Sequence, residues 1–108
     1  MAFIDLSERS TQEPVPGYHV RFVHSETMTM AYWTIEAGAP IPEHQHPHEQ
    51  IATLIEGAFE LTVGGETQRL GPGDVAVIPS NVPHAGRAVT PCRMIDAFQP
   101  VREDYVDG

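Results

Sequence analysis

Basic residues and long apolar runs are scarce in this sequence. The 108 residues include six basic and 15 acidic side chains, which gives a formal net charge of −9. Because phosphate binding requires clustered basic residues, this balance argues against a nucleic-acid partner. No apolar run approaches the roughly 18 residues of a membrane-spanning helix, and we expect no contact with a membrane. Residues 1–5 lack the basic and apolar regions of a signal peptide, which predicts a cytoplasmic protein.

Cysteine and helical periodicity are scarce as well. Cys92 is the single cysteine, so the chain can form neither an internal disulfide nor a cysteine-based zinc site. We interpret Cys92 as a small apolar strand residue. The apolar residues do not recur at helical spacing but gather in short runs rich in β-branched and aromatic side chains, separated by glycine and proline. This pattern predicts an all-β fold.

Eight such runs follow residue 17, and each predicts a strand. They are Tyr18–His24, Met28–Glu36, Gln50–Glu56, Ala58–Val63, Glu66–Leu70, Val75–Ile78, His84–Val89 and Cys92–Phe98. Gly64-Gly65 is a hairpin signal, since the tight turns that join antiparallel strands need positive φ. Eight regular strands favour a closed barrel or a double-sheet jelly roll. We expect an N-terminal arm over residues 1–17 and one barrel domain over residues 18–108, ending in a short tail.

The histidines show a pattern that suits a metal site. His44 and His46 are two residues apart, so in an extended segment both rings project from the same face. A third histidine, His84, follows His46 at a distance of 38 positions. Taken alone, the His44–His46 pair is equally compatible with a polar loop that happens to be rich in histidine.

The wider spacing resembles the two sequence motifs of the cupin family. The first motif corresponds to Gly38-x5-His44-x-His46-x3-Gln50-x6-Gly57, and the second corresponds to Gly73-x5-Pro79-x-Asn81-x2-His84-x3-Ala88. Gln50 stands where the family usually has a glutamate ligand. Asn81 replaces a glycine, and asparagine tolerates the left-handed backbone that such a position requires.

The cupin resemblance implies a double-stranded β-helix, that is, a jelly-roll barrel. It also implies one divalent transition metal bound by His44, His46, Gln50 and His84. Nitrogen-rich ligation suits Zn, Ni, Fe, Mn or Cu. Since all four ligands would be neutral, the metal would keep its full charge and attract an anionic ligand. The alternative is that Gln50 does not reach the metal and that the three histidines alone bind it.

Two segments resemble a narrower group, the KdgF-type pectin-degradation proteins. These small cupins convert 4,5-unsaturated monouronates into open-chain keto sugars. The similar segments are His-Pro-His-Glu-Gln-Ile-Ala over residues 46–52, and residues 95–105 with the pattern Asp-x-Phe-x-Pro-x-Arg. The resemblance implies that Asp96, Phe98 and Arg102 are active-site residues, and it also implies a homodimer that uses the N-terminal arm and the edge strands.

The residues themselves give these positions a chemical role. Met94, Asp96 and Phe98 share one face of a strand, and the apolar members suggest that this face lines the barrel interior. A carboxylate beside a metal is a candidate general acid or base. Arg102 can grip a ligand carboxylate with two hydrogen bonds. The alternatives are that Asp96 pairs with an arginine at the rim, that Phe98 is a core residue and that Arg102 is a solvated tail residue. For His48, we favour a position beside the ligands or at the rim over a bond to the metal.

These observations favour a metal-dependent lyase or isomerase that acts on a small anionic molecule, such as an unsaturated uronate. Two other classes stay open. One is an iron-dependent dioxygenase, because several small cupins activate oxygen. The other is a non-enzymatic cupin that binds a small ligand through its metal.

Overall fold

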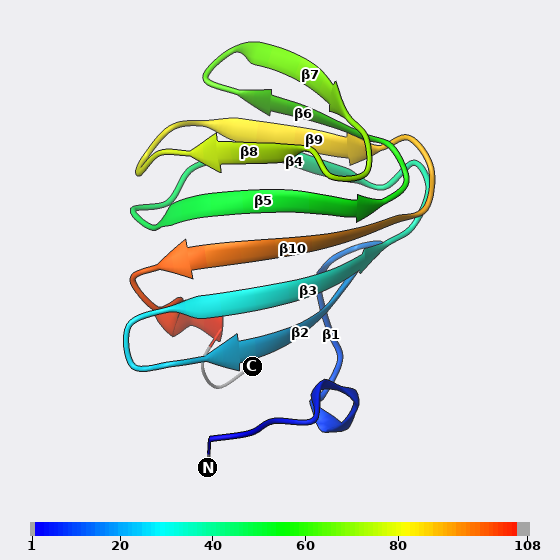
Figure 1. Ribbon diagram of the computed structural model, residues 1–108. Helices are drawn as coiled ribbons and strands as arrows, with labels where there is room; N and C mark the ends of the chain where they lie inside the picture. The colour runs from blue at the N-terminus through cyan, green and yellow to red at the C-terminus, as the bar shows by residue number, and fades with distance from the viewer. Residues whose placement is uncertain (1, 106–108) are drawn as a thin grey trace.

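Two antiparallel sheets face each other in the computed structural model, which describes residues 2–105 (Figure 1). The strands are β1 (Gln12–Val15), β2 (Tyr18–His24), β3 (Thr29–Ile35), β4 (Pro40–His44), β5 (Glu49–Glu56), β6 (Phe59–Val63), β7 (Glu66–Leu70), β8 (Val75–Ile78), β9 (His84–Ala88) and β10 (Cys92–Gln99). Short 3-10 turns occupy Leu6–Glu8 and Glu103–Tyr105. The predicted all-β jelly roll is therefore confirmed. No helix in the described range is long and apolar enough to cross a membrane.

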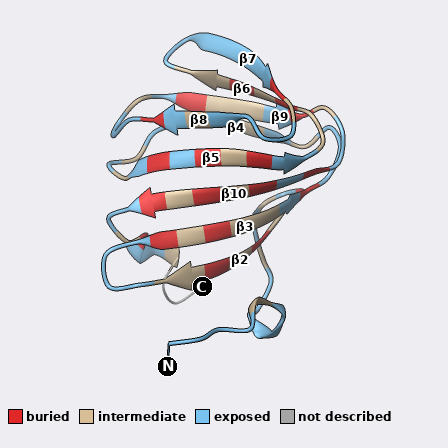
Figure 2. Cartoon of the chain, viewed as in Figure 1, coloured by how far each residue is buried: buried red, intermediate tan, exposed pale blue. Residues whose placement is uncertain are grey.

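The larger sheet has the strand order β1-β2-β3-β10-β5-β8, and the smaller sheet has the order β4-β9-β6-β7. Strand β10 pairs with both β3 and β5, so it lies in the middle of the larger sheet. Every second side chain of β10 is buried (Figure 2), from Cys92 through Met94 and Asp96 to Phe98. The predicted inward face of this strand is thus confirmed, and it carries one carboxyl into the barrel.

The eight predicted strands are present, with each end within one residue of the expected position. Strands β1 and β4 were not predicted, because each contains proline, which cannot donate to a sheet ladder. Both strands lie at the edge of their sheet, where proline is tolerated. The arm predicted for residues 1–17 thus contributes an edge strand that pairs with β2. Strand β4 ends at His44 and pairs with β9.

The space between the sheets is filled mainly by aliphatic and aromatic side chains. Ile35, Leu54 and Ile78 are among the largest side chains with almost no exposed surface. Within residues 2–105, five buried residues are polar or charged: Thr29, Gln50, His84, Asp96 and Arg102. Burying such groups is unfavourable unless each has a partner or a function. Four of these five line one cavity, which is described below.

Left-handed backbone occurs where the sequence predicts it. Gly64 and Gly65 have φ values of 56° and 87° in the turn between β6 and β7. Asn81, which stands where the cupin motif has glycine, has a φ of 62°. Gly38 and Gly57, the two glycines of the first motif, have φ values of 80° and 96°.

These last two glycines differ in their surroundings, which allows a matched test. A Cβ added to Gly38 would meet no atom within 4 Å. At Gly57 it would collide with the Pro91 carbonyl oxygen and lie 2.8 Å from Thr90 Oγ1. We expect Gly38→Ala to lower the free energy of unfolding by about 1–2 kcal/mol, the cost of left-handed backbone with a side chain. Gly57→Ala should cost clearly more, as measured by urea denaturation. Equal losses in the two variants would contradict this account of the turn after β5.

Candidate functional site

Three histidines from two distant parts of the chain converge at one end of the barrel. His44 ends β4, His84 begins β9, and the two residues are paired directly across these strands. His46 follows two residues after His44. One ring nitrogen from each histidine lies within 4.8 Å of the nitrogens of the other two. The centroids of the His44 and His84 rings are 4.2 Å apart, and those of His46 and His84 are 4.9 Å apart.

The orientation of each ring is set by its own backbone. In all three rings, Nδ1 lies 2.9 Å from a carbonyl oxygen two residues away along the chain, that of Pro42, His48 or Val82. A carbonyl oxygen only accepts, so each Nδ1 carries the proton and donates it, which leaves a lone pair on Nε2. The Nε2 atom of His84 is buried and has no partner within the described chain. Three imidazoles that present free lone pairs to one point form a group that can hold a metal ion.

Gln50 brings an oxygen to the same place. Its side chain is buried in β5, and Oε1 lies 3.2 Å from Nε2 of His46. Both atoms present lone pairs, so in this orientation neither donates a hydrogen bond to the other. Two ligand atoms that bind one ion at about 2.1 Å and at right angles are themselves about 3 Å apart. The residues present therefore fit a divalent transition metal.

Burial favours the neutral form of His46 and His84, which is the form that binds a metal. Desolvation, together with the positive charges of Arg102 and His84, lowers the pKa of His46 to about 4. Desolvation also lowers the pKa of His84. The hydrogen bonds from these rings to the backbone oxygens of His48 and Val82 raise the pKa of each ring, but by less than desolvation lowers it.

Asp96 is a buried carboxyl group beside these ligands. Asp96 is 5% exposed, and its Oδ1 atom has no hydrogen-bond partner within the described chain. Burial raises the pKa of Asp96 to about 7, although the neighbouring Gln50 amide, the Trp33 indole and the charge of Arg102 each lower it. A carboxyl group with such a pKa can hold or release a proton near neutral pH.

Arg102 is held in place by aromatic rings and a carboxylate. Its guanidinium carbon lies 4.7 Å from the centroid of Phe98 and 4.5 Å from that of Tyr105. Nε and Nη2 donate to the two carboxylate oxygens of Asp104, at 3.1 and 2.8 Å. Arg102 is therefore a buried residue and not a solvated tail residue, and its ion pair is with Asp104 and not with Asp96. Sequence reasoning singled out neither Asp104 nor Tyr105, since nothing in their spacing shows that the chain turns back after β10.

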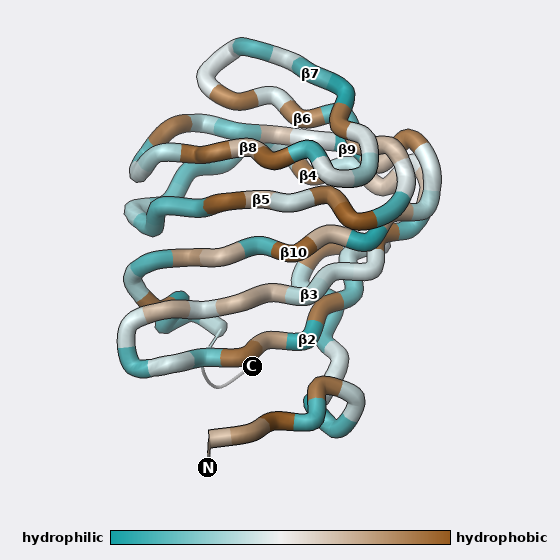
Figure 3. Tube along the Cα trace, in the orientation of Figure 1, coloured by the Kyte–Doolittle hydropathy of each residue, from teal (hydrophilic) through white to brown (hydrophobic). Residues whose placement is uncertain are grey.

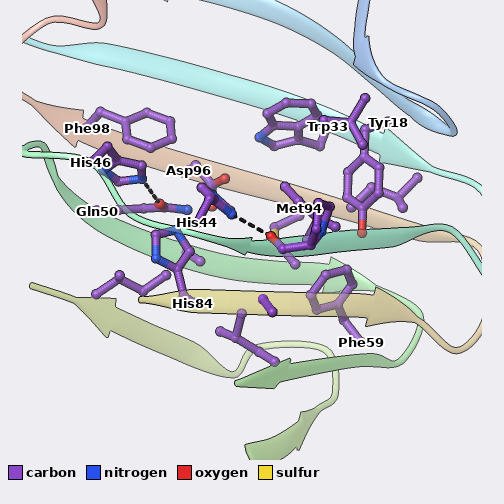
Figure 4. Close-up of a pocket in the computed structure, with 18 of the residues that line it drawn as sticks. Tyr18, Trp33, His44, His46, Gln50, Phe59, His84, Met94, Asp96 and Phe98 are labelled. Atoms are coloured by element: carbon purple, nitrogen blue, oxygen red, sulfur yellow. Dashed lines mark hydrogen bonds between the residues drawn. The ribbon is translucent and has the colours of Figure 1, made fainter. Parts of the chain in front are cut away.

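One cavity of about 260 Å³ connects these groups. Every residue that the sequence proposed for the site lines it: His44, His46, Gln50, His84, Asp96, Phe98 and Arg102. In Figure 4, His46, Gln50 and Phe98 lie on one side of the pocket, and Tyr18, Trp33 and Phe59 lie on the other. His48 is outside this lining; it orients His46 through its backbone oxygen.

The cupin domain family matches residues 31–98, a range that contains the three histidines, Gln50 and Asp96. The chain belongs to the cupin family. Its fold is close to that of a solved KdgF from Halomonas sp., with a TM-score of 0.90, 33% identity, and coverage of 98% of this chain and 99% of that one.

Two curated proteins show further similarity. The pectin degradation protein KdgF of Dickeya dadantii is 31% identical over 84 residues, which cover 76% of this chain and 76% of that protein. The HTH-type transcriptional regulator PuuR of Escherichia coli is 30% identical over 103 residues, which cover 89% of this chain but 54% of the regulator. The chain thus spans about half the length of that second relative.

The geometry distinguishes His84 from His48, which gives a test of the centre. We expect His84→Ala to weaken zinc binding by more than the roughly 10–100-fold that loss of an outer partner costs. His48→Ala keeps the backbone oxygen that orients His46, so it should change the affinity by less than about tenfold. Isothermal titration with Zn²⁺ measures both variants. Equal losses, or a larger loss in His48→Ala, would contradict the assignment.

Proposed function

We propose that His44, His46, Gln50 and His84 bind one divalent transition metal, which is Zn, Ni, Fe, Mn or Cu. We further propose that the protein is a metal-dependent lyase or isomerase acting on a small anionic molecule, with a 4,5-unsaturated uronate as the favoured substrate. The observation that supports this most strongly is the buried Asp96 carboxyl beside the three converging imidazoles. Similarity to a pectin degradation protein supports the uronate class.

Arg102 provides the positive charge that a substrate carboxylate needs. Its bonds to Asp104 use Nε and Nη2, so a substrate carboxylate would be met by Nη1. The rings of Phe98 and Tyr105 both lie against the guanidinium and restrict its movement. A fixed guanidinium loses less entropy when it binds a carboxylate than a free one would.

Asp96 is the group placed to move a proton. When bound, the metal would act as a Lewis acid that polarises a substrate oxygen. Asp96 would take the proton of the C1 hydroxyl group while the bond between C1 and the ring oxygen breaks. It would then deliver that proton to C4 of the enol-ether double bond, and C5 would become a keto carbon. This transfer is an isomerisation, so atoms and electrons balance without a co-reactant. Because Asp96 is buried, the proton that it carries would not exchange readily with bulk water.

Replacing this carboxyl separates chemistry from metal binding. We expect Asp96→Asn to bind zinc like the parent but to lose at least about 100-fold in turnover, the usual contribution of a general acid or base. The assay follows the ultraviolet absorbance of a 4,5-unsaturated galacturonate as its double bond disappears. A variant that opens this substrate as fast as the parent would show that Asp96 is not the proton carrier. Turnover with redox-inert zinc also excludes the iron-dependent dioxygenase.

A second candidate is a cupin that senses a small ligand through its metal. The match to the transcriptional regulator PuuR over 89% of this chain favours it. The same cavity would then hold a ligand without changing it. Recovery of an unsaturated uronate unchanged after long incubation with the metal-loaded protein would favour sensing over catalysis.

We also propose that the protein is a homodimer, because one outer face of the larger sheet is apolar. Ile51 and Val77 are paired across β5 and β8, and they are 43% and 61% exposed. Ile55 and Val75 on the same two strands are also exposed. Figure 3 shows hydrophobic stretches along both strands. Exposed apolar groups of this kind commonly mark an interface, and we name these four residues the outer β5–β8 face.

A charge on this face should separate the two copies. We expect Val77→Glu to be monomeric at concentrations where the parent is dimeric, since the new carboxylates would be buried without partners. Met28→Glu is the control, because Met28 is 40% exposed but lies in the turn between β2 and β3. Light scattering coupled to gel filtration gives the masses. A monomeric parent, or a dimeric Val77→Glu protein, would rule out this interface.

A further inference from the structure

The cavity has two chemically different ends. The histidine end holds the imidazoles, Gln50, Asp96 and Arg102. The opposite end, which we call the inner end, is lined by Tyr18, Trp33, Ile35, Phe59, Leu61 and Met94. Figure 4 shows Tyr18, Trp33, Met94 and Phe59 grouped there, away from His46 and Gln50. The proposed chemistry uses only the histidine end.

The inner end offers a ligand very little to bond with. The hydroxyl group of Tyr18 already donates to the Ala39 carbonyl oxygen at 3.0 Å. The indole Nε1 of Trp33 is buried without a partner in the described chain, but it lies close enough to Asp96 to lower the pKa of that carboxyl, so this one free donor lies on the Asp96 side of the ring. The remaining side chains are aliphatic, aromatic or a thioether. A hydroxyl group placed here would lose its bonds to water, and the only strong acceptor among these side chains would be the oxygen of the Tyr18 hydroxyl.

Apolar groups, in contrast, fit the inner end well. The rings of Tyr18 and Trp33 meet edge to face, with centroids 6.0 Å apart, and form a rigid wall. Ile35 and Phe59 are 2% and 3% exposed, so this wall is closed off from solvent. A hydrocarbon or aromatic group that enters would leave water without giving up a hydrogen bond.

We propose that the inner end is an apolar subsite, and that this protein takes a small carboxylate whose remaining part is a hydrocarbon or aromatic tail or presents a face without hydroxyl groups. The carboxylate lies at the histidine end, and the apolar part lies between Trp33, Phe59 and Met94. This inference rests on the proposed anion site and narrows its substrate class. A uronate meets the requirement only through a planar, hydroxyl-free edge such as that of a C4=C5 double bond.

The single tryptophan reports directly on the inner end. Trp33 fluorescence is followed while zinc-loaded protein is titrated with propionate, butyrate, hexanoate, 3-phenylpropionate and galacturonate. We expect the dissociation constant to fall about fourfold per added methylene until the subsite is filled. Galacturonate, which carries a hydroxyl group at C4, should bind more weakly than hexanoate. A dissociation constant that does not change with chain length, or galacturonate as the tightest ligand, would overturn the proposal.

Two matched variants test the place of binding. Leu61→Phe fills the inner end. In this variant hexanoate should bind no more tightly than propionate, and the dissociation constant of propionate should not change. Leu70→Phe is the control, because Leu70 belongs to the same core cluster but does not line the cavity. The proposal is wrong if the two folded variants show the same dependence of the dissociation constant on chain length. Should Leu61→Phe not fold, the series on the parent protein decides the question alone.

Repeating the series without zinc separates this inference from the proposed function. A gain with chain length that persists without metal, together with no effect of zinc on propionate, supports the subsite and shows that Arg102 binds the carboxylate without help from the metal. Zinc-dependent propionate binding without a gain along the series leaves the proposed anion site standing and overturns the subsite.

Discussion

The hydrogen bond from each imidazole Nδ1 to a carbonyl oxygen two residues away is the interaction on which the site depends. It fixes both the tautomer and the direction of the ring, so that each Nε2 faces the same point. The carbonyls lie in short extended segments, and β4 and β9 hold two of these segments together because His44 pairs with His84. The fold therefore positions the nitrogens mainly through backbone geometry.

The same end of the barrel collects buried groups that would be unfavourable elsewhere. Arg102 is compensated by Asp104 and two aromatic rings, whereas Asp96 Oδ1 and His84 Nε2 have no partners in the described chain. Unpartnered buried polar atoms destabilise a protein, and they cluster where a ligand or a metal completes them. Although the chain has a net charge of −9, the guanidinium of Arg102 places a positive charge in this cavity, where it helps to lower the pKa of His46. An anion can therefore be drawn to this cavity although the protein as a whole repels it.

Much of this arrangement could be predicted from the sequence, for physical reasons that differ between elements. Strands such as β5 and β10 were predictable because their buried positions alternate with more exposed ones, and this alternation gives the sequence a period of two. Gln50 and the three histidines were predictable from the spacing of the motifs. Strand β4 was not, since Pro40 and Pro42 suggest a turn unless the strand is known to lie at an edge.

Other features depend on contacts between distant residues and leave no local pattern. The clamp of Asp104 and Tyr105 on Arg102 forms because the chain turns back after β10, and the backbone N–H of Arg102 bonds to Thr29 Oγ1 at 2.8 Å. The apolar inner end is also invisible in the sequence. Tyr18, Trp33 and Phe59 have the same hydrophobic character as ordinary core residues, and only the packing leaves space between them.

The central claim is that three imidazoles and one amide oxygen bind a single ion. Anomalous diffraction from crystals soaked in zinc, measured at the zinc absorption edge, tests it most directly. The account predicts one peak about 2 Å from Nε2 of His44, His46 and His84 and from Oε1 of Gln50. No peak at this position, or a peak that leaves one of these four atoms beyond bonding distance, would contradict it.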